Sequence, residues 1–176
     1  MSCVLLPEAL HVVEGGWMKT LMKALQVMMM EHGGKRILSM LDRKVDDLSG
    51  CLARNSMRLM FKLRRFYKVT ELTRASFQEF PTIILCVMLV IALSPPGTFV
   101  PSSETEGVLS CMHALMSWHF LARADVIQEW QIQLLEHRTH ELQKLFKSVF
   151  GAALGDDTAE GKAKKGNGTN FPKYHA

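Results

Sequence analysis

The sequence has little of what marks disulfide-stapled, metal-bound or β-rich proteins. Its four cysteines lie far apart and form no C-x-x-C pair, and no signal peptide is evident. Only two tyrosines are present, and no segment alternates polar and apolar residues over the length of a strand. These absences argue against a disulfide framework or a zinc site and favour reduced thiols in an intracellular protein. The cysteines are Cys3, Cys51, Cys86 and Cys111.

Helix-forming residues dominate what is present. The chain has 176 residues, of which 48% are hydrophobic and 22% charged, and 12 of them are methionines. This composition predicts a mostly α-helical protein, an irregular helical bundle with enough apolar residues for a core. The formal net charge of +4 is too modest to indicate a nucleic-acid partner by itself.

Changes in composition divide the chain into three parts. A helical domain is expected over residues 1–150, because apolar residues recur there at helical spacing. Residues 151–170 are rich in Gly, Ala, Asp, Lys, Asn and Thr, which predicts a disordered linker. Residues 171–176, FPKYHA, resemble the start of an ordered segment that is cut short. The chain is therefore predicted to be a middle section of a larger protein.

Apolar spacing predicts the individual helices. One is expected over residues 12–30, ended by glycines 33–34, and a second over residues 35–52. Residues 106–150 are expected to form two helices with a break near residues 124–125. The face of the first helix consists of Trp17, Leu21, Met22, Leu25, Met28 and Met29. The apolar side of the last consists of Ile127, Trp130, Leu134, Leu142, Leu145, Phe146 and Val149, with Gln131, Glu136, Arg138, Glu141 and Lys144 facing away.

Residues 81–94, PTIILCVMLVIALS, form the most apolar window. Crossing a bilayer takes about 20 apolar residues, whereas runs of about 10 to 14 are more often buried helices. The window is therefore predicted to be a core helix. The alternative is a small single-pass or membrane-associated protein, which stays open because residues 80–103 carry no charge. Basic residues before the window and acids after it would then place the N-terminal side in the cytoplasm.

A basic stretch from Arg54 to Lys68 is the strongest candidate for binding. It contains no acidic residue, and basic residues interleaved with aromatic ones can hold phosphates while rings stack on bases. The alternative is an amphipathic helix whose basic side only faces water. DNA is thus the candidate partner, and no small-molecule substrate is evident. The candidate DNA-binding residues are Arg58, Lys62, Arg64, Arg65 and Lys68.

No complete catalytic constellation is present, since the sequence has neither a glycine-rich phosphate loop nor a G-x-S-x-G nucleophile elbow. His137 and His140 lie one helical turn apart, which can begin a metal site. A third ligand would have to come from elsewhere, and a solvated helix face is the favoured interpretation. His113 and His119 are predicted to be core or half-buried histidines, and residues 28–30 are predicted to be core-filling methionines.

Short motifs in a fixed order resemble a transposase family. Residues 7–17 (PEALHVVEGGW) resemble the P-D-x-L-H … G-x-x-K entry of Plavaka-type transposases, relatives of the CACTA and Kyakuja-Dileera-Zisupton groups. Residues 69–76 look like the family's element before an apolar helix, and residues 108–121 and 136–146 look like two of its later helices. Residues 171–175 (FPKYH) resemble its f-x-I-P-K-f-H signature. The matching signature positions are Pro172, Lys173 and His175.

The resemblance implies a fold, a reaction and a cofactor for the parent protein. Such transposases have an RNase H-like domain in which three acids bind two divalent ions, Mg²⁺, for DNA cleavage and transfer. This chain would be the helical part inserted in or flanking that domain. Glu8 replaces the Asp of the family motif, His11 is retained, and the catalytic acids are expected outside the chain. The implied protein is a nuclear, transposase-derived fragment without catalytic activity or cofactor of its own; the alternative location is a membrane.

Overall fold

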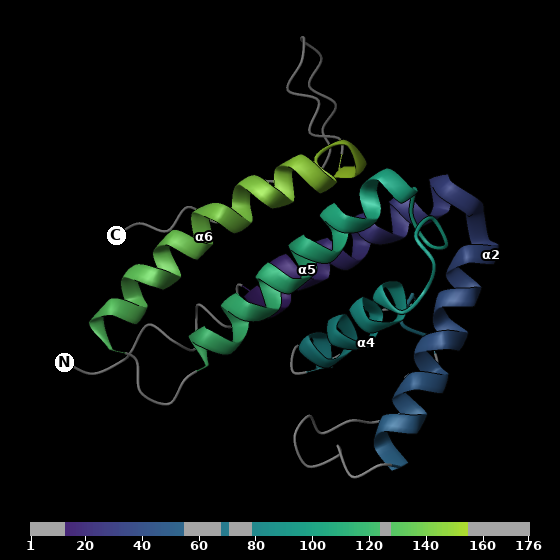
Figure 1. Cartoon of the computed structure of the whole chain (residues 1–176), viewed down its shortest axis with the longest axis horizontal. Helices are drawn as coiled ribbons and strands as arrows, with labels where there is room; N and C mark the ends of the chain where they lie inside the picture. The colour runs from purple at the N-terminus through teal and green to yellow at the C-terminus, as the bar shows by residue number, and fades with distance from the viewer. Residues whose placement is uncertain (1–12, 55–67, 71–78, 124–127, 155–176) are drawn as a thin grey trace.

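The structure is a computed structural model that describes residues 13–54, 68–70, 79–123 and 128–154. In chain order its elements are η1 (Val13–Met18), α2 (Lys19–Arg54), α4 (Phe80–Ala92), α5 (Ser102–Ala122), α6 (Glu129–Phe150) and η4 (Ala152–Leu154). None of the described residues lies in a strand, and the prediction of a mostly α-helical protein is confirmed. Figure 1 shows α5 and α6 side by side, with α4 between α5 and the second half of α2.

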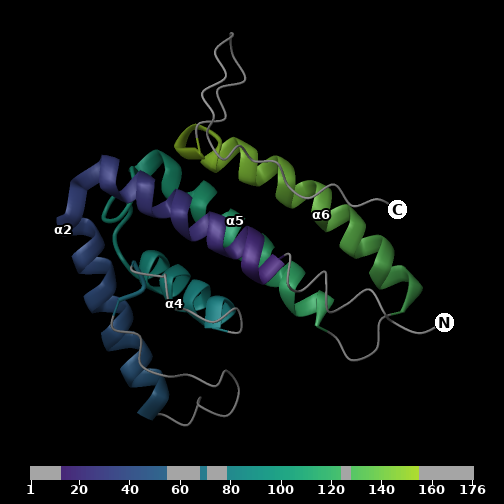
Figure 2. The same ribbon diagram turned by 180° about the vertical axis from the view of Figure 1, so that it is seen from behind.

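α2 is two helices joined end to end at a pair of glycines. Gly33 and Gly34 have non-helical backbone angles, and the φ of Gly34 is 65°, in the left-handed region that favours glycine. The break predicted at residues 33–34 is thereby confirmed. Figure 2 shows the two halves at a steep angle to each other, with α4 lying within that angle.

The apolar face predicted for the first helix is buried as expected. Met28 and Met29 are part of this core, but Met30 is 42% exposed, so core filling is wrong for that residue. Met30 lies on the side of α2 that carries Val27, which is also exposed. The buried residues of this face are Trp17, Leu21, Met22, Leu25, Met28 and Met29.

The apolar window forms α4, a core helix of 13 residues. Pro81 lies in its first turn, where the missing N–H of proline costs no helical hydrogen bond. Most of its side chains are buried, and the helix packs against α2 and α5. Within the described ranges, no helix combines the length and apolar character needed to cross a membrane.

α5 and α6 form an antiparallel hairpin (Figure 1). The two helices predicted within residues 106–150 are present, with the break between Ala122 and Glu129. α5 begins at Ser102, earlier than predicted, directly after Pro101. α6 ends at Phe150 and is followed by η4, a single 3₁₀ turn at the start of the segment predicted to be a linker. Residues 155–176 lie outside the described residues.

The apolar side predicted for α6 reaches full burial only in the second half of the helix. Trp130 is 57% exposed, so its predicted place on the core side is wrong. The physical reason is that the fully buried α6 residues all lie in its second half: Leu142, Phe146 and Phe150. Three more are half-buried: Leu134, Leu145 and Val149. Of the residues predicted to face solvent, Gln131 is half-buried and the rest are exposed: Glu136, Arg138, Glu141 and Lys144. Ile127 lies outside the described residues.

Candidate functional site

Of the residues predicted to bind DNA, the structure describes Lys68, whose side chain is exposed. The other four lie outside the described residues: Arg58, Lys62, Arg64 and Arg65. The same is true of the motif residues Glu8 and His11 and of the signature residues Pro172, Lys173 and His175. The candidate DNA-binding site is therefore visible only at its C-terminal end, Lys68, among the described residues.

Lys68 begins a turn that hydrogen bonds fix to α2. The backbone N–H of Thr70 donates to Oδ1 of Asp42 at 2.9 Å, and the Thr70 hydroxyl donates to Oδ2 at 2.6 Å. The side-chain amide of Gln26 donates to the Thr70 carbonyl at 2.9 Å, and Val69 is buried. Because Gln26 and Asp42 belong to the two halves of α2, the turn also ties these halves together.

Replacing Asp42 by alanine is expected to lower the free energy of unfolding by about 2 kcal/mol. The change removes a charged acceptor that receives two hydrogen bonds from Thr70. Urea denaturation followed by circular dichroism measures the loss. Asp47→Ala is the matched control, because Asp47 is exposed on the same helix and its loss should cost less than about 0.5 kcal/mol. Equal losses in the two variants would contradict the role given to Asp42.

The connection between α4 and α5 is held to α2 by further polar contacts. The Lys44 ammonium donates to the Ser94 hydroxyl at 3.1 Å and lies 5.5 Å from the centre of the Phe99 ring. Nε2 of His32 lies 2.8 Å from the Gly97 carbonyl oxygen. These interactions engage Lys44 and His32 within the fold, so neither is a good candidate for binding a ligand.

The two histidines predicted for the α5 core differ in their surroundings. His119 is 1% exposed, and burial, with a smaller effect of the nearby Arg123 charge, lowers its pKa to about 4. The imidazole is therefore neutral at neutral pH, and its ring meets that of Phe120 edge-on. His113 is exposed, so the prediction is correct for His119 and wrong for His113, which lies on the solvent side of α5.

Two of the described cysteines, Cys86 and Cys111, are buried free thiols. Burial raises the pKa of Cys86 to about 11 and that of Cys111 to about 12, which keeps both protonated and unreactive. Cys51 is exposed near the end of α2, and Cys3 lies outside the described residues. The two buried thiols thus act as small apolar groups of the core.

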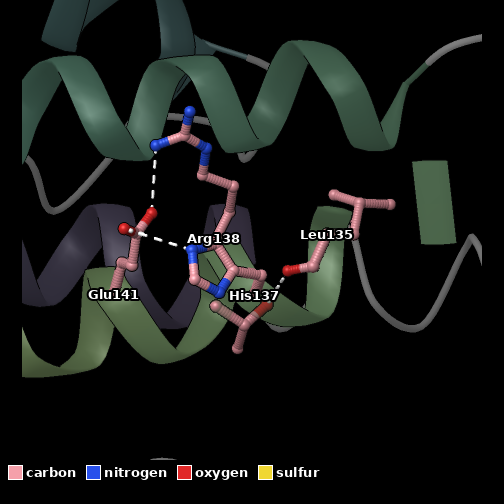
Figure 3. Close-up of polar contacts among 5 residues, drawn as sticks. Leu135, His137, Arg138 and Glu141 are labelled. Atoms are coloured by element: carbon pink, nitrogen blue, oxygen red, sulfur yellow. Dashed lines mark hydrogen bonds and ion pairs between the residues drawn. The ribbon is translucent and has the colours of Figure 1, made fainter. Parts of the chain in front are cut away.

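A polar cluster on α6 includes one of the two histidines singled out in the sequence. Nε2 of His137 lies 3.3 Å from Oε1 of Glu141, and Nη1 of Arg138 lies 3.0 Å from Oε2 of the same carboxylate (Figure 3). All three side chains are exposed, and so is His140. The structure therefore pairs His137 with Glu141, one turn further along the helix. The intervening Thr139 accepts a hydrogen bond from the Trp118 indole of α5 at 2.8 Å.

Described residues line a larger and a smaller depression beside α2. The larger, of about 580 Å³, is a shallow groove along α2 that contains the exposed Val27 and Met30 between Lys23 and Glu31. The smaller, of about 200 Å³, lies between α2 and α4 beside Lys44. Neither has the enclosed shape and convergent buried polar groups of a typical small-molecule site.

Among the described residues, no three His, Cys, Asp or Glu side chains of one chain come together to hold a metal ion. Comparisons with protein-family models, with curated proteins and with solved structures found no significant match.

Proposed function

We propose that this chain is a helical, non-catalytic part of a transposase-derived protein that binds DNA through the basic stretch ending at Lys68. The observation that carries the proposal is the anchored turn at residues 68–70. It holds the last cation of the stretch exposed on the surface of α2. The order of short motifs along the sequence supports the transposase origin.

Both ends of the basic stretch are placed on the same helix. The stretch begins at Arg54, the last residue of α2, and Thr70, just after its other end, hydrogen-bonds to Asp42. Asp42 and Arg54 are about 18 Å apart along the helix axis, at 1.5 Å per residue. Because the turn at residues 68–70 is held in place, less conformational entropy is lost when Lys68 meets a ligand. Both oxygens of Asp42 accept hydrogen bonds from Thr70, so this acid is engaged within the turn.

Further cations lie on the same half of α2. Lys35, Arg36 and Arg43 are exposed, and the two arginines are seven residues apart, which places them on one face of the helix. Binding that does not depend on DNA sequence relies on several cations that meet successive phosphates. The exposed Asp47, four residues after Arg43, offsets part of this charge, so these cations supplement the basic stretch and do not replace it.

Fluorescence anisotropy of a labelled DNA duplex at several salt concentrations tests the proposal. The full chain is expected to bind with an affinity that falls steeply as salt is raised. The triple variant Arg58→Ala, Lys62→Ala, Arg65→Ala should make the slope of log affinity against log salt less negative by about 3, because three phosphate contacts are lost.

The matched control removes the same charge from exposed lysines outside the stretch: Lys19→Ala, Lys144→Ala and Lys147→Ala. This variant should keep most of the affinity and most of the salt dependence. No binding, binding that does not respond to salt, or an equal loss in both variants would refute the proposal.

A further inference from the structure

Two side-chain atoms on α6, Nε2 of His137 and Oε1 of Glu141, have the separation of two ligands of one zinc ion. They are 3.3 Å apart. Zinc bonds to nitrogen and oxygen of about 2.0–2.2 Å at tetrahedral angles place neighbouring ligand atoms about 3.4 Å apart. A charge-assisted N–H···O hydrogen bond is shorter, about 2.7–2.9 Å. One zinc ion can therefore contact both atoms with little movement of either side chain.

The carboxylate is also oriented as in a metal site. Arg138 holds Oε2 of Glu141 at 3.0 Å, which leaves Oε1 directed toward His137, and Figure 3 shows the two contacts on different oxygens. Hydrogen bonds of this kind fix the orientation of metal-binding carboxylates in proteins. The pair is accessible to an ion from solvent, since the His137 and Glu141 side chains are 69% and 49% exposed.

Two ligands do not complete a stable zinc site, which takes four, and the described part of one chain supplies no group of three. We propose that a second copy of this chain provides the other two ligands, so that Zn²⁺ bridges two α6 helices packed antiparallel about a two-fold axis. Each copy contributes Nε2 of His137 and Oε1 of Glu141. The site is incomplete without the second copy. The DNA-binding proposal uses none of these residues.

The rest of the helix surface fits this pairing. In a two-fold contact, if residue i of one copy contacts residue j of the second, then residue j of the first contacts residue i of the second. An axis midway between residues 137 and 141 therefore sets His137 opposite Glu141 of the second copy. Trp130 lies seven residues before His137, on the same face of the helix. In a single copy of the chain its side chain is 57% exposed. In the pair it lies opposite Ser148 of the second copy, an exposed position.

The charges along α6 of one copy are complementary to those of a second copy when the two helices are antiparallel. The first half carries the exposed acids Glu129 and Glu136 and one exposed cation, Arg138, and the second half carries the exposed lysines Lys144 and Lys147 and one exposed acid, Glu141, so the two halves still differ in the sign of their net charge. Antiparallel packing brings the acidic half of one copy against the basic half of the other, whereas parallel packing would place like charges together. Charge thus selects the orientation in which the four zinc ligands meet.

Size-exclusion chromatography with light scattering of the full chain tests the inference. The chain is expected to be a monomer with EDTA and a dimer with one zinc per two chains when ZnCl₂ is added. His137→Ala and Glu141→Ala should each abolish the zinc-dependent dimer. Because both side chains are exposed, the variants should keep their helical circular dichroism spectrum. Trp130→Ala should still bind zinc at the same stoichiometry, but its weaker dimer should dissociate at a several-fold higher protein concentration.

His140→Ala is the matched control, since it removes an exposed histidine of the same helix that is not a ligand in the proposed site. It should dimerise with zinc like the unmodified chain. The inference is overturned if the dimer forms equally in EDTA or if zinc binds without dimerisation. It is also overturned if His140→Ala abolishes the zinc-dependent dimer or if the His137 and Glu141 variants keep it.

Discussion

Replacing Phe146 by alanine is expected to lower the free energy of unfolding by about 3–5 kcal/mol. Phe146 is fully buried on the face of α6 that meets the core, and its ring centre lies 5.2 Å from that of Phe150. The variant loses the burial of a large apolar side chain and leaves a cavity that its neighbours can fill only in part. A loss of this size approaches the whole stability of many domains.

Chemical denaturation of the variant and the unmodified chain measures the effect. Phe120→Ala is the matched control, because it removes the same side chain from the neighbouring helix α5 at a position that is 53% exposed. Its cost should stay below about 1 kcal/mol. If both variants lost the same stability, the second half of α6 would not be part of the core.

Lowering the pH from 7 to 4 is expected to remove about 3 kcal/mol of folding free energy through His119 alone. Burial, followed by the charge of Arg123, lowers the pKa of this imidazole from 6.5 to about 4 in the folded chain. Between these two values the unfolded chain binds a proton that the folded chain does not, so acid favours unfolding. The stabilising contribution is complete above about pH 6.5 and is lost as the pH falls through about 4.

Urea denaturation at a series of pH values isolates this effect by comparison with His119→Gln. The variant cannot titrate at this position, so its stability should depend less on pH over the same window than that of the unmodified chain. His113→Gln removes an exposed histidine of the same helix and should retain the full pH dependence. Parallel curves for the unmodified chain and His119→Gln would contradict the buried, neutral state of His119.

The helices could be predicted from the sequence because their causes are local. Apolar residues at helical spacing predict the buried face of the first helix, and residues 33–34 break it because only glycine readily adopts the left-handed conformation found at Gly34. The length of the apolar window predicts a core helix, and α4 is buried between α2 and α5. Each of these inferences needs only residues within a few turns of one another.

Exposure at the edges of the bundle could not be predicted in the same way. Trp130 belongs to the apolar side of its helix by spacing, yet it is exposed because the core lies against the other half of α6. Met30 likewise continues a methionine run but borders an open groove. Periodicity identifies which face of a helix is apolar, and the neighbouring helices determine how much of that face is covered.

The sequence by itself determined the helical class, the break in α2, the core character of α4 and the presence of a basic stretch before Lys68. Only the tertiary structure decided which polar groups meet. Asp42 and Gln26 bind Thr70 across 28 and 44 residues of sequence, and the Trp118 indole reaches Thr139 on the next helix. Hydrogen bonds depend on the position and direction of single atoms, which helix packing sets and residue spacing along the chain does not.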